Sequence, residues 1–200
     1  MQLFYNPFID EKTAGFCFDK EESKHLIRVL RNTTGDTIQI TNGKGCKFTG
    51  ELMNSDEKKC QISIIKTEMV EKHWPYYLHI AIAPTKMNDR MEWFVEKATE
   101  IGVDEITPLI CDRSERKEIR QDRMEKVAIS AMKQSLKFTL PQINEAVTFG
   151  NFVKNNTDGI RLIAHCEDRN KTTLNQLEKK EKYTVLIGPE GDFSAPEIDL

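Results

Sequence analysis

The sequence lacks the long apolar segments and the leader that membrane and exported proteins carry. No apolar run approaches the ~20 residues that cross a bilayer. The N-terminal stretch MQLFYNPFIDEK has neither the basic start nor the apolar core of a secretory signal. Hydrophobic residues make up 38% of the chain, which is close to the average of folded globular domains. We therefore expect a folded cytoplasmic protein with one large domain or two small ones.

Paired cysteines and clustered histidines are also lacking. The five cysteines are scattered and odd in number, and none forms a C-x-x-C pair, which argues against a disulfide framework and against a zinc site. The four histidines are dispersed and show no H-x-x-x-H spacing. The sequence therefore predicts reduced thiols and no metal.

An excess of positive charge is absent as well. The net charge is -3, so any contact with nucleic acid has to depend on local patches. The charged stretch 112–126 is one candidate, although such runs are usually a solvated face. The alternative is contact with an RNA backbone by its basic side chains, which are Arg113, Arg116, Lys117, Arg120 and Arg123.

Residues 1–70 predict a small β-barrel with one helix. The β-rich stretches LFYN, TIQI, CKFTGELM and CQISII are separated by turn signals, of which Asn42-Gly43 is the strongest because tight hairpins need positive φ. The helix is expected over residues 21–31, with Leu26, Val29 and Leu30 on one buried face. The stretch EKHWPY then breaks the pattern at its proline, so we expect the domain boundary at about residues 70–76.

Residues 76–200 predict an α/β domain. The apolar stretches YLHIAIA, EITPLI, RLIAH and YTVLIG alternate with helices expected at about 88–101 and 118–136 and with a short TTLNQLE segment. Strands that are apolar throughout and separated by helices indicate a parallel sheet covered on both faces.

The helix expected at 88–101 has two unlike sides. Its apolar side should pack on the sheet and consists of Met91, Phe94, Val95, Ala98 and Ile101. The other side carries Arg90, Trp93, Lys97 and Glu100, and Lys86 lies just ahead of it. A tryptophan among cations can stack on a base while the lysines meet phosphates. It can equally pack under a neighbouring element or a partner subunit, and both interpretations remain open.

The segment LIGPEGDFSAPEI, residues 186–198, is the clearest candidate for chemistry. Gly188 and Gly191 allow positive φ and close backbone approach, and Ser194 with Glu197 forms a capping box that starts a helix. Such folds hold nucleotides at the carboxyl edge of a parallel sheet, where a strand ends in a tight glycine turn and a helix begins. An ordinary strand-to-helix turn is the alternative.

GPEGDFS followed by Glu197-Ile198 resembles the GPEGGFS-x-x-E motif of the bacterial ribosomal RNA small subunit methyltransferase E family. These are SPOUT-superfamily enzymes that make N3-methyluridine in 16S ribosomal RNA. Further matching segments follow in the same order over nearly the whole chain: HLIRVLR with Gly35-Asp36, KMNDRMEW, KATEIGV, and Gln134-Ser135 ahead of Leu140-Pro141.

The resemblance implies a PUA-like RNA-binding barrel at 1–70, a SPOUT methyltransferase domain with a trefoil knot at 76–200, and a homodimer. It also implies S-adenosylmethionine as cofactor and 16S ribosomal RNA, within the small ribosomal subunit, as partner. Two cofactor loops are expected, one formed by Ala164, His165 and Cys166 and the other by Ile187, Gly188, Pro189, Glu190 and Gly191.

Two further sets of residues are candidates, one for the reaction and one for RNA binding. Uridine N3 carries a proton at neutral pH, so Glu190 and Gln134 are candidates for a general base or for a hydrogen-bonding group at the uridine. The RNA-binding candidates are His25, Arg28 and Arg31, of which the two arginines lie three apart and should point the same way, together with Lys86, Arg90 and Lys97.

The sequence departs from the family pattern twice. Asp192 replaces the second glycine of the motif, where a carboxylate would alter the turn or lie beside the positive sulfonium. The family continues with a strand and an L-G-x-R-I-L-R segment, whereas this sequence stops at Leu200. We therefore expect that the C-terminal knot segment is missing.

Three other functions remain as alternatives. An RNA-binding protein of this architecture without catalysis fits the basic patches. A phosphate-processing α/β protein would use the Gly188 turn, but the sequence has no G-x-x-x-x-G-K-[ST] motif. Another SPOUT enzyme, such as a transfer RNA ribose 2′-O methyltransferase, is disfavoured by the PUA-like half.

Overall fold

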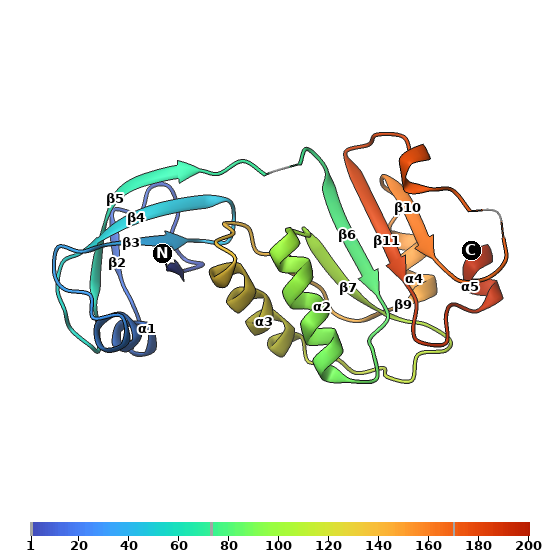
Figure 1. Ribbon diagram of the computed structural model, residues 1–200, viewed down its shortest axis with the longest axis horizontal. Coiled ribbons are helices and arrows are strands. Elements are labelled where there is room, and N and C mark those ends of the chain that lie inside the picture. Colours follow the sequence, from blue (N-terminus) through green and yellow to red (C-terminus); the bar gives the residue numbers. More distant parts are fainter. Residues whose placement is uncertain (1, 73, 170) are drawn as a thin grey trace. The chain divides into compact units, whose positions relative to one another are not determined.

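The computed structural model describes residues 2–72, 74–169 and 171–200, and the chain divides into two compact units (Figure 1). The first unit comprises Met1–Lys72 and Met132–Leu140, and the second comprises His73–Ala131 and Pro141–Leu200. His73, which falls within the predicted boundary, lies outside the described residues. In the described part of the chain, no helix combines the length and the apolar character that a membrane crossing needs.

A five-stranded sheet forms the first unit. Its hydrogen-bonded order is β1-β3-β4-β5-β2, in which β1 runs parallel to β3 and the other neighbours are antiparallel. The strands are β1 (Leu3–Tyr5), β2 (Gly15–Cys17), β3 (Thr37–Thr41), β4 (Cys46–Leu52) and β5 (Gln61–Met69). The predicted hairpin at Asn42-Gly43 is confirmed, because Gly43 has a φ of 74° between the antiparallel strands β3 and β4.

One face of the sheet lines the hydrophobic core of this unit. Along β4, every second residue from Cys46 is buried, which is the period of a strand with one face against a core. The segment Met132–Leu140 packs against the β3–β4 hairpin: the N–H of Gly45 donates to the Phe138 carbonyl at 2.8 Å, and the N–H of Leu140 donates to the Gly43 carbonyl at 2.8 Å. A piece of the second half of the sequence therefore completes the first unit.

The prediction of one regular α-helix at 21–31 was wrong. An α-helix, α1 (Lys20–Lys24), passes into a π-helical turn, His25–Val29, in which the N–H of Leu30 reaches the carbonyl of His25. The wider turn rotates the later residues, so Leu26 is buried while Val29 is 64% exposed. Arg31 lies beyond the helix with a φ of 59°, so the three-residue spacing does not align it with Arg28.

The second unit is built on a parallel sheet of six strands. Its order is β10-β11-β6-β7-β8, and β9 pairs with β7 outside this path. Every strand pair in it is parallel, as predicted. The strands are β6 (Tyr77–Ile82), β7 (Glu105–Ile110), β8 (Gln142–Ile143), β9 (Val147–Thr148), β10 (Ile160–Ala164) and β11 (Lys182–Ile187).

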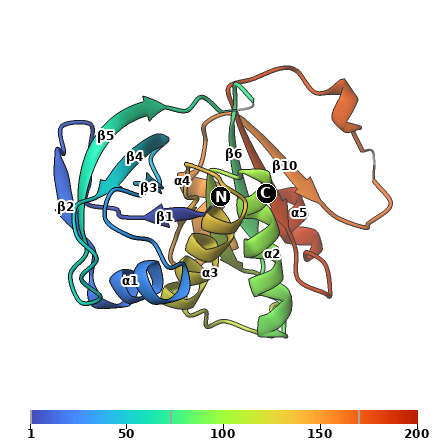
Figure 2. The same ribbon diagram turned by 60° about the vertical axis from the view of Figure 1, so that its left-hand side comes forward.

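Helices connect these strands. The connecting helices are α2 (Asn88–Ile101), α3 (Gln121–Gln134) and α4 (Phe149–Asn155), a 3-10 turn lies at Leu174–Gln176 between β10 and β11, and α5 (Ala195–Asp199) follows β11. Helices α2 and α3 lie next to each other in both views (Figures 1 and 2). Helix α4, which the sequence analysis did not predict, packs Phe149 and Phe152 into a buried cluster with residues of the central strands. Helix α3 is shorter than the expected 118–136.

Helix α2 keeps most of its predicted apolar side. Met91, Val95 and Ala98 are each at most 2% exposed. Ile101 is 61% exposed, and its predicted burial is wrong. The buried face passes from Ala98 to the fully buried Thr99, and Ile101 in the last turn of the helix lies outside it. Gly102 ends the helix with a φ of 97°.

Candidate functional site

The carboxyl ends of three neighbouring strands meet at one edge of the parallel sheet. Ala164 of β10 is in register with Ile187 of β11, and Ile187 is in register with Ile82 of β6. The N–H of Ala83 donates to the Ile187 carbonyl at 2.8 Å, which extends the pairing by one residue. The loops that follow β6, β10 and β11 therefore start from the same edge, which we call the carboxyl edge.

The turn after β11 is compact because of a close approach at Gly188. A Cβ at that position would lie 3.0 Å from the Phe193 ring, which is itself fully buried. The sequence analysis noted that Gly188 and Gly191 allow positive φ and close backbone approach; the close approach is found at Gly188, but the left-handed residue of this turn is Asp192, with a φ of 62°. A short acidic side chain tolerates this conformation because it can hydrogen-bond to nearby backbone.

Asp192 joins the two predicted cofactor loops. Its Oδ2 accepts the N–H of Cys166 at 2.7 Å, and its Oδ1 accepts the N–H of Phe193 at 2.8 Å. These N–H groups, that of Cys166 foremost, hold the pKa of Asp192 below its ordinary value. The carboxylate is therefore charged at neutral pH, and it ties the loop after β10 to the turn after β11.

Glu190 makes a similar link to the loop after β6. Its Oε1 accepts the N–H of Lys86 at 3.0 Å, and this hydrogen bond is the main reason that the pKa of Glu190 lies below its ordinary value. The Lys86 ammonium pairs with Glu115 at 2.9 Å. Three of the loops at the carboxyl edge are thus connected through the turn that contains Glu190 and Asp192.

The loop after β7 reaches the same turn. Arg113 donates from one guanidinium nitrogen to the carbonyls of Gly191 at 2.8 Å and Phe193 at 3.2 Å. The sequence analysis considered Arg113 only as a contact for RNA backbone, and nothing in its spacing indicated this clamp.

The predicted capping box is confirmed and does more than start α5. The N–H of Ser194 donates to Glu197 Oε2 at 2.8 Å, and the N–H of Asp112 donates to Glu197 Oε1 at 2.9 Å. The Ser194 hydroxyl also donates to the Asp112 carboxylate at 2.7 Å. Glu197 is 6% exposed, so this buried carboxylate secures the loop after β7 to the start of α5.

The predicted cofactor residues are thus brought together at one edge. Ala164 and Ile187 end paired strands, and His165 and Cys166 lead into the loop that Asp192 holds. Nδ1 of His165 is buried and, within the described part of the chain, has no hydrogen-bond partner. An unsatisfied buried nitrogen beside backbone-rich loops suits a ligand that offers hydrogen-bonding groups.

Gln134, the second catalytic candidate, is placed differently. It is exposed at the end of α3, in the segment Met132–Leu140 that belongs to the first unit, whereas Glu190 belongs to the second. Neither unit alone brings these two side chains together.

Three of the six predicted RNA-binding residues, Arg28, Lys86 and Lys97, already have acidic partners. Arg28 pairs with Glu57 at 2.6 Å, and Lys97 pairs with Glu96 at 2.7 Å and Glu100 at 2.9 Å. Nε2 of His25 lies 2.7 Å from the side-chain nitrogen of Gln2. Arg31 and Arg90 are exposed, and Trp93 beside Arg90 is 62% exposed. Of the charged stretch, Arg120 pairs with Asp122 and Arg123 with Glu92.

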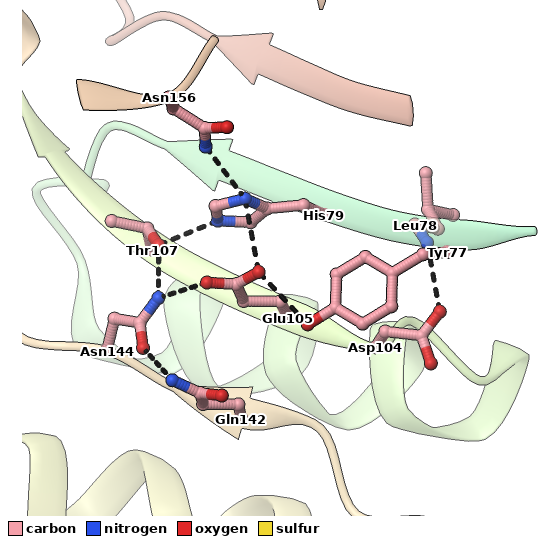
Figure 3. Close-up of polar contacts among 9 residues, drawn as sticks. All are labelled: Tyr77, Leu78, His79, Asp104, Glu105, Thr107, Gln142, Asn144 and Asn156. Carbon is pink, nitrogen blue, oxygen red and sulfur yellow. Dashed lines mark hydrogen bonds and ion pairs between the residues drawn. The ribbon is translucent and has the colours of Figure 1, made fainter. Parts of the chain in front are cut away.

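A second polar cluster lies toward the amino ends of the same strands (Figure 3). His79 of β6, 2% exposed, lies 2.7 Å from the Thr107 hydroxyl and 3.4 Å from Glu105 Oε2. The amide nitrogen of Asn144 donates to Glu105 and to Thr107, at 2.7 Å each, and that of Asn156 lies 3.2 Å from Nδ1 of His79. Burial lowers the pKa of His79 more strongly than Glu105 raises it.

This amino-edge cluster borders an open pocket of about 390 Å³. In residues 2–72, 74–169 and 171–200, no group of three or more His, Cys, Asp or Glu side chains is placed to hold a metal ion.

The fold and the tied loops define a class of α/β proteins that bind a small ligand at the carboxyl ends of parallel strands. A model described as an RNA methyltransferase domain matches residues 72–200, and one described as an RNA methyltransferase PUA domain matches residues 18–65. The first match covers more than half of the chain, so the chain belongs to this RNA methyltransferase family. The predicted family and fold class are confirmed.

Individual relatives agree with this assignment. A crystal structure titled "probable rRNA-methyltransferase", from Porphyromonas gingivalis, is 39% identical, covers 100% of this chain and 84% of its own, and has a TM-score of 0.91. A Legionella pneumophila structure titled "putative methyltransferase", in complex with the bound cofactor SAM, is 26% identical over 98% of this chain and 83% of its own, with a TM-score of 0.85. Ribosomal RNA small subunit methyltransferase E of Rickettsia conorii is 28% identical over 88% of this chain and 72% of its own.

Proposed function

We propose that this protein transfers a methyl group from S-adenosylmethionine to N3 of a uridine in 16S ribosomal RNA, as a homodimer that acts on the small ribosomal subunit. The observation that carries the proposal is the carboxyl edge, where Ala164 and Ile187 end paired strands and Asp192 ties the loops that follow them. Relatives named for small-subunit rRNA methylation, and a relative solved with SAM, support the substrate and the cofactor.

The residues at the carboxyl edge fit this cofactor. The loop of Ala164, His165 and Cys166 and the loop of Ile187, Gly188, Pro189, Glu190 and Gly191 would hold it, and the unsatisfied Nδ1 of His165 offers a polar contact. A Cβ at Gly188 would crowd the buried Phe193 ring at 3.0 Å, so glycine suits this close approach. When bound, S-adenosylmethionine supplies a methyl group that its sulfonium already activates.

The protein's own residues have to position the uridine and either accept its N3 proton or hydrogen-bond to it. Glu190 is ionised at neutral pH because the Lys86 N–H stabilises its carboxylate, and the ionised form is the one that a general base needs. The lowered pKa also makes Glu190 a weaker base, which favours hydrogen bonding to the target over complete proton removal. Gln134 is our second candidate for hydrogen bonding at the uridine.

RNA binding is assigned to exposed cations. Arg31 and Arg90 are exposed, and Trp93 next to Arg90 presents an aromatic face on which a base could stack. His25, Arg28, Lys86 and Lys97 remain candidates that would exchange their present partners for phosphates. With ribosomal RNA as its substrate, the protein would act in the cytoplasm.

Transfer of labelled methyl from S-adenosylmethionine to 16S ribosomal RNA tests the proposal. Free RNA and assembled small subunits are compared as substrates. Labelled RNA in either substrate supports the proposal. RNA binding without any transfer to either substrate contradicts it and favours the binding protein without catalysis.

A further inference from the structure

Two segments of the carboxyl edge have no strand pairing to hold them in place. Residues 165–169 follow β10, and residues 188–194 follow β11. Both segments leave the sheet after the paired residues Ala164 and Ile187. Their relative position therefore depends on side chains that bridge them.

Asp192 provides such a bridge. One carboxylate oxygen accepts the Cys166 N–H at 2.7 Å, and the other accepts the Phe193 N–H at 2.8 Å. Hydrogen bonds from N–H groups to a charged carboxylate are among the stronger ones in proteins. Both oxygens thus have a backbone donor, which leaves the carboxylate oriented toward the loops themselves.

The backbone at Asp192 is arranged around this bridge. Its φ of 62° lies in the left-handed region, which non-glycine residues rarely adopt, and its N–H donates to the Pro189 carbonyl at 2.9 Å. The guanidinium of Arg113 holds the flanking carbonyls of Gly191 and Phe193. A residue that accepts an unfavourable φ and makes two charge-assisted hydrogen bonds has a role that glycine could not fill.

We propose that Asp192 is a positioning residue that holds the Cys166 loop against the β11–α5 turn, and so preorganises the cofactor site before S-adenosylmethionine binds. The carboxylate acts through the two loops and does not contact the sulfonium. The proposal depends on the proposed function only in taking these loops as the cofactor site.

Three variants of the protein distinguish the effect of the Asp192 carboxylate from the effect of its backbone conformation. Asp192→Gly removes the carboxylate and relieves the left-handed φ, Asp192→Ala removes the carboxylate and keeps the strain, and Asp192→Asn keeps the shape but can accept only one of the two N–H groups. Asp158→Gly is the matched control, because Asp158 is exposed and precedes β10 at the other end of the strand.

Amide hydrogen exchange of the ligand-free protein gives the first measurement. We expect exchange at Cys166 and Phe193 to become about tenfold faster in Asp192→Gly and Asp192→Ala, while the strands β10 and β11 keep their rates. Asp158→Gly should match the unmodified protein at both amides. Unchanged exchange at both amides in Asp192→Gly overturns the proposal.

The second measurement is titration calorimetry with S-adenosylmethionine and with S-adenosylhomocysteine, which lacks the positive sulfonium. A positioning role predicts that Asp192→Gly and Asp192→Ala weaken both ligands equally, by about tenfold, with Asp192→Asn in between. Loss of affinity for S-adenosylmethionine alone would mean that Asp192 faces the sulfonium, and unchanged affinity for both would mean that the bridge is irrelevant; either result overturns the proposal. If the unmodified protein binds neither ligand, the proposed function fails, and the exchange measurement still decides whether Asp192 holds the loops.

Discussion

Glu197 in the last helix accepts the backbone N–H of Asp112 at 2.9 Å, although 85 residues separate them in the sequence. The other oxygen of the same carboxylate accepts the N–H of Ser194 at 2.8 Å. One buried side chain thus caps α5 and anchors the loop that follows β7. Glu197, which marks the start of a helix in the sequence, therefore also holds two distant segments together.

Removing this carboxylate should destabilise the protein. Glu197→Ala leaves the part-buried N–H groups of Asp112 and Ser194 without their acceptor, and a hydrogen bond to a charged group contributes about 1.5–3 kcal/mol. Urea unfolding should show a loss of that order in the free energy of unfolding. Glu178→Ala, at a side chain 79% exposed, is the control and should change it by less than about 0.5 kcal/mol. Equal stability of the two variants would show that the link contributes nothing.

The Arg113 clamp should affect cofactor binding. Arg113→Ala releases the carbonyls of Gly191 and Phe193, so the turn after β11 loses a restraint that a bound cofactor would need. We expect S-adenosylmethionine to bind about tenfold more weakly, which corresponds to about 1.4 kcal/mol. Calorimetric titration measures this, and Arg120→Ala, an exposed arginine of the same stretch paired with Asp122, serves as the control. An Arg113→Ala protein that binds as tightly as the control would refute the role of the clamp.

Stability should depend on pH through His79. Its folded-state pKa is lowered by burial, so below its ordinary value near 6.5 the unfolded chain binds the proton more readily than the folded one. The stability contributed by neutral His79 is complete above pH 6.5 and is lost as the pH falls below that value toward the folded-state pKa. Urea unfolding at a series of pH values should show this decline, and His79→Gln should flatten it between pH 6.5 and 5. The same pH dependence in both proteins would contradict the assignment to His79.

Arg90 should contribute one phosphate contact. Arg90→Ala is expected to weaken RNA binding and to reduce the slope of log affinity against log salt by about 0.7 to 0.9. Fluorescence anisotropy with a labelled 16S fragment over a range of KCl concentrations measures the slope. Arg90→Lys keeps the charge and should keep the slope. If the alanine and lysine variants share one slope, Arg90 does not contact phosphate.

The sequence analysis predicted those elements whose signal is local. Helix α2 has the expected bounds, 88–101, because its apolar spacing extends over four turns and a left-handed glycine ends it. The parallel strands followed from apolar stretches that need cover on both faces. Helix α4 and the two-residue strands β8 and β9 were missed, since segments this short carry too few residues for a periodic pattern.

The errors in the site arose where tertiary contacts override local propensity. Glycine is the usual residue at positive φ, and Gly188 and Gly191 were singled out because they allow it, but the positive φ of this turn is at Asp192, whose carboxylate reaches Cys166, 26 residues away in the sequence. The π-helical turn at His25–Val29 has no signature in the residue pattern, and it moved Val29 to the surface. Arg113 gave no sign of its clamp because its partners are backbone carbonyls, which every residue has.

The central claim is that the carboxyl edge directs a methyl group to N3 of a uridine. Its most direct test is to incubate the full-length protein with S-adenosylmethionine and small ribosomal subunits, digest the RNA to nucleosides and separate them by chromatography with mass spectrometry. Our account predicts N3-methyluridine, reduced in amount in the Arg113→Ala protein. Methylation only on ribose 2′-oxygens, or on a base other than uracil, would contradict it.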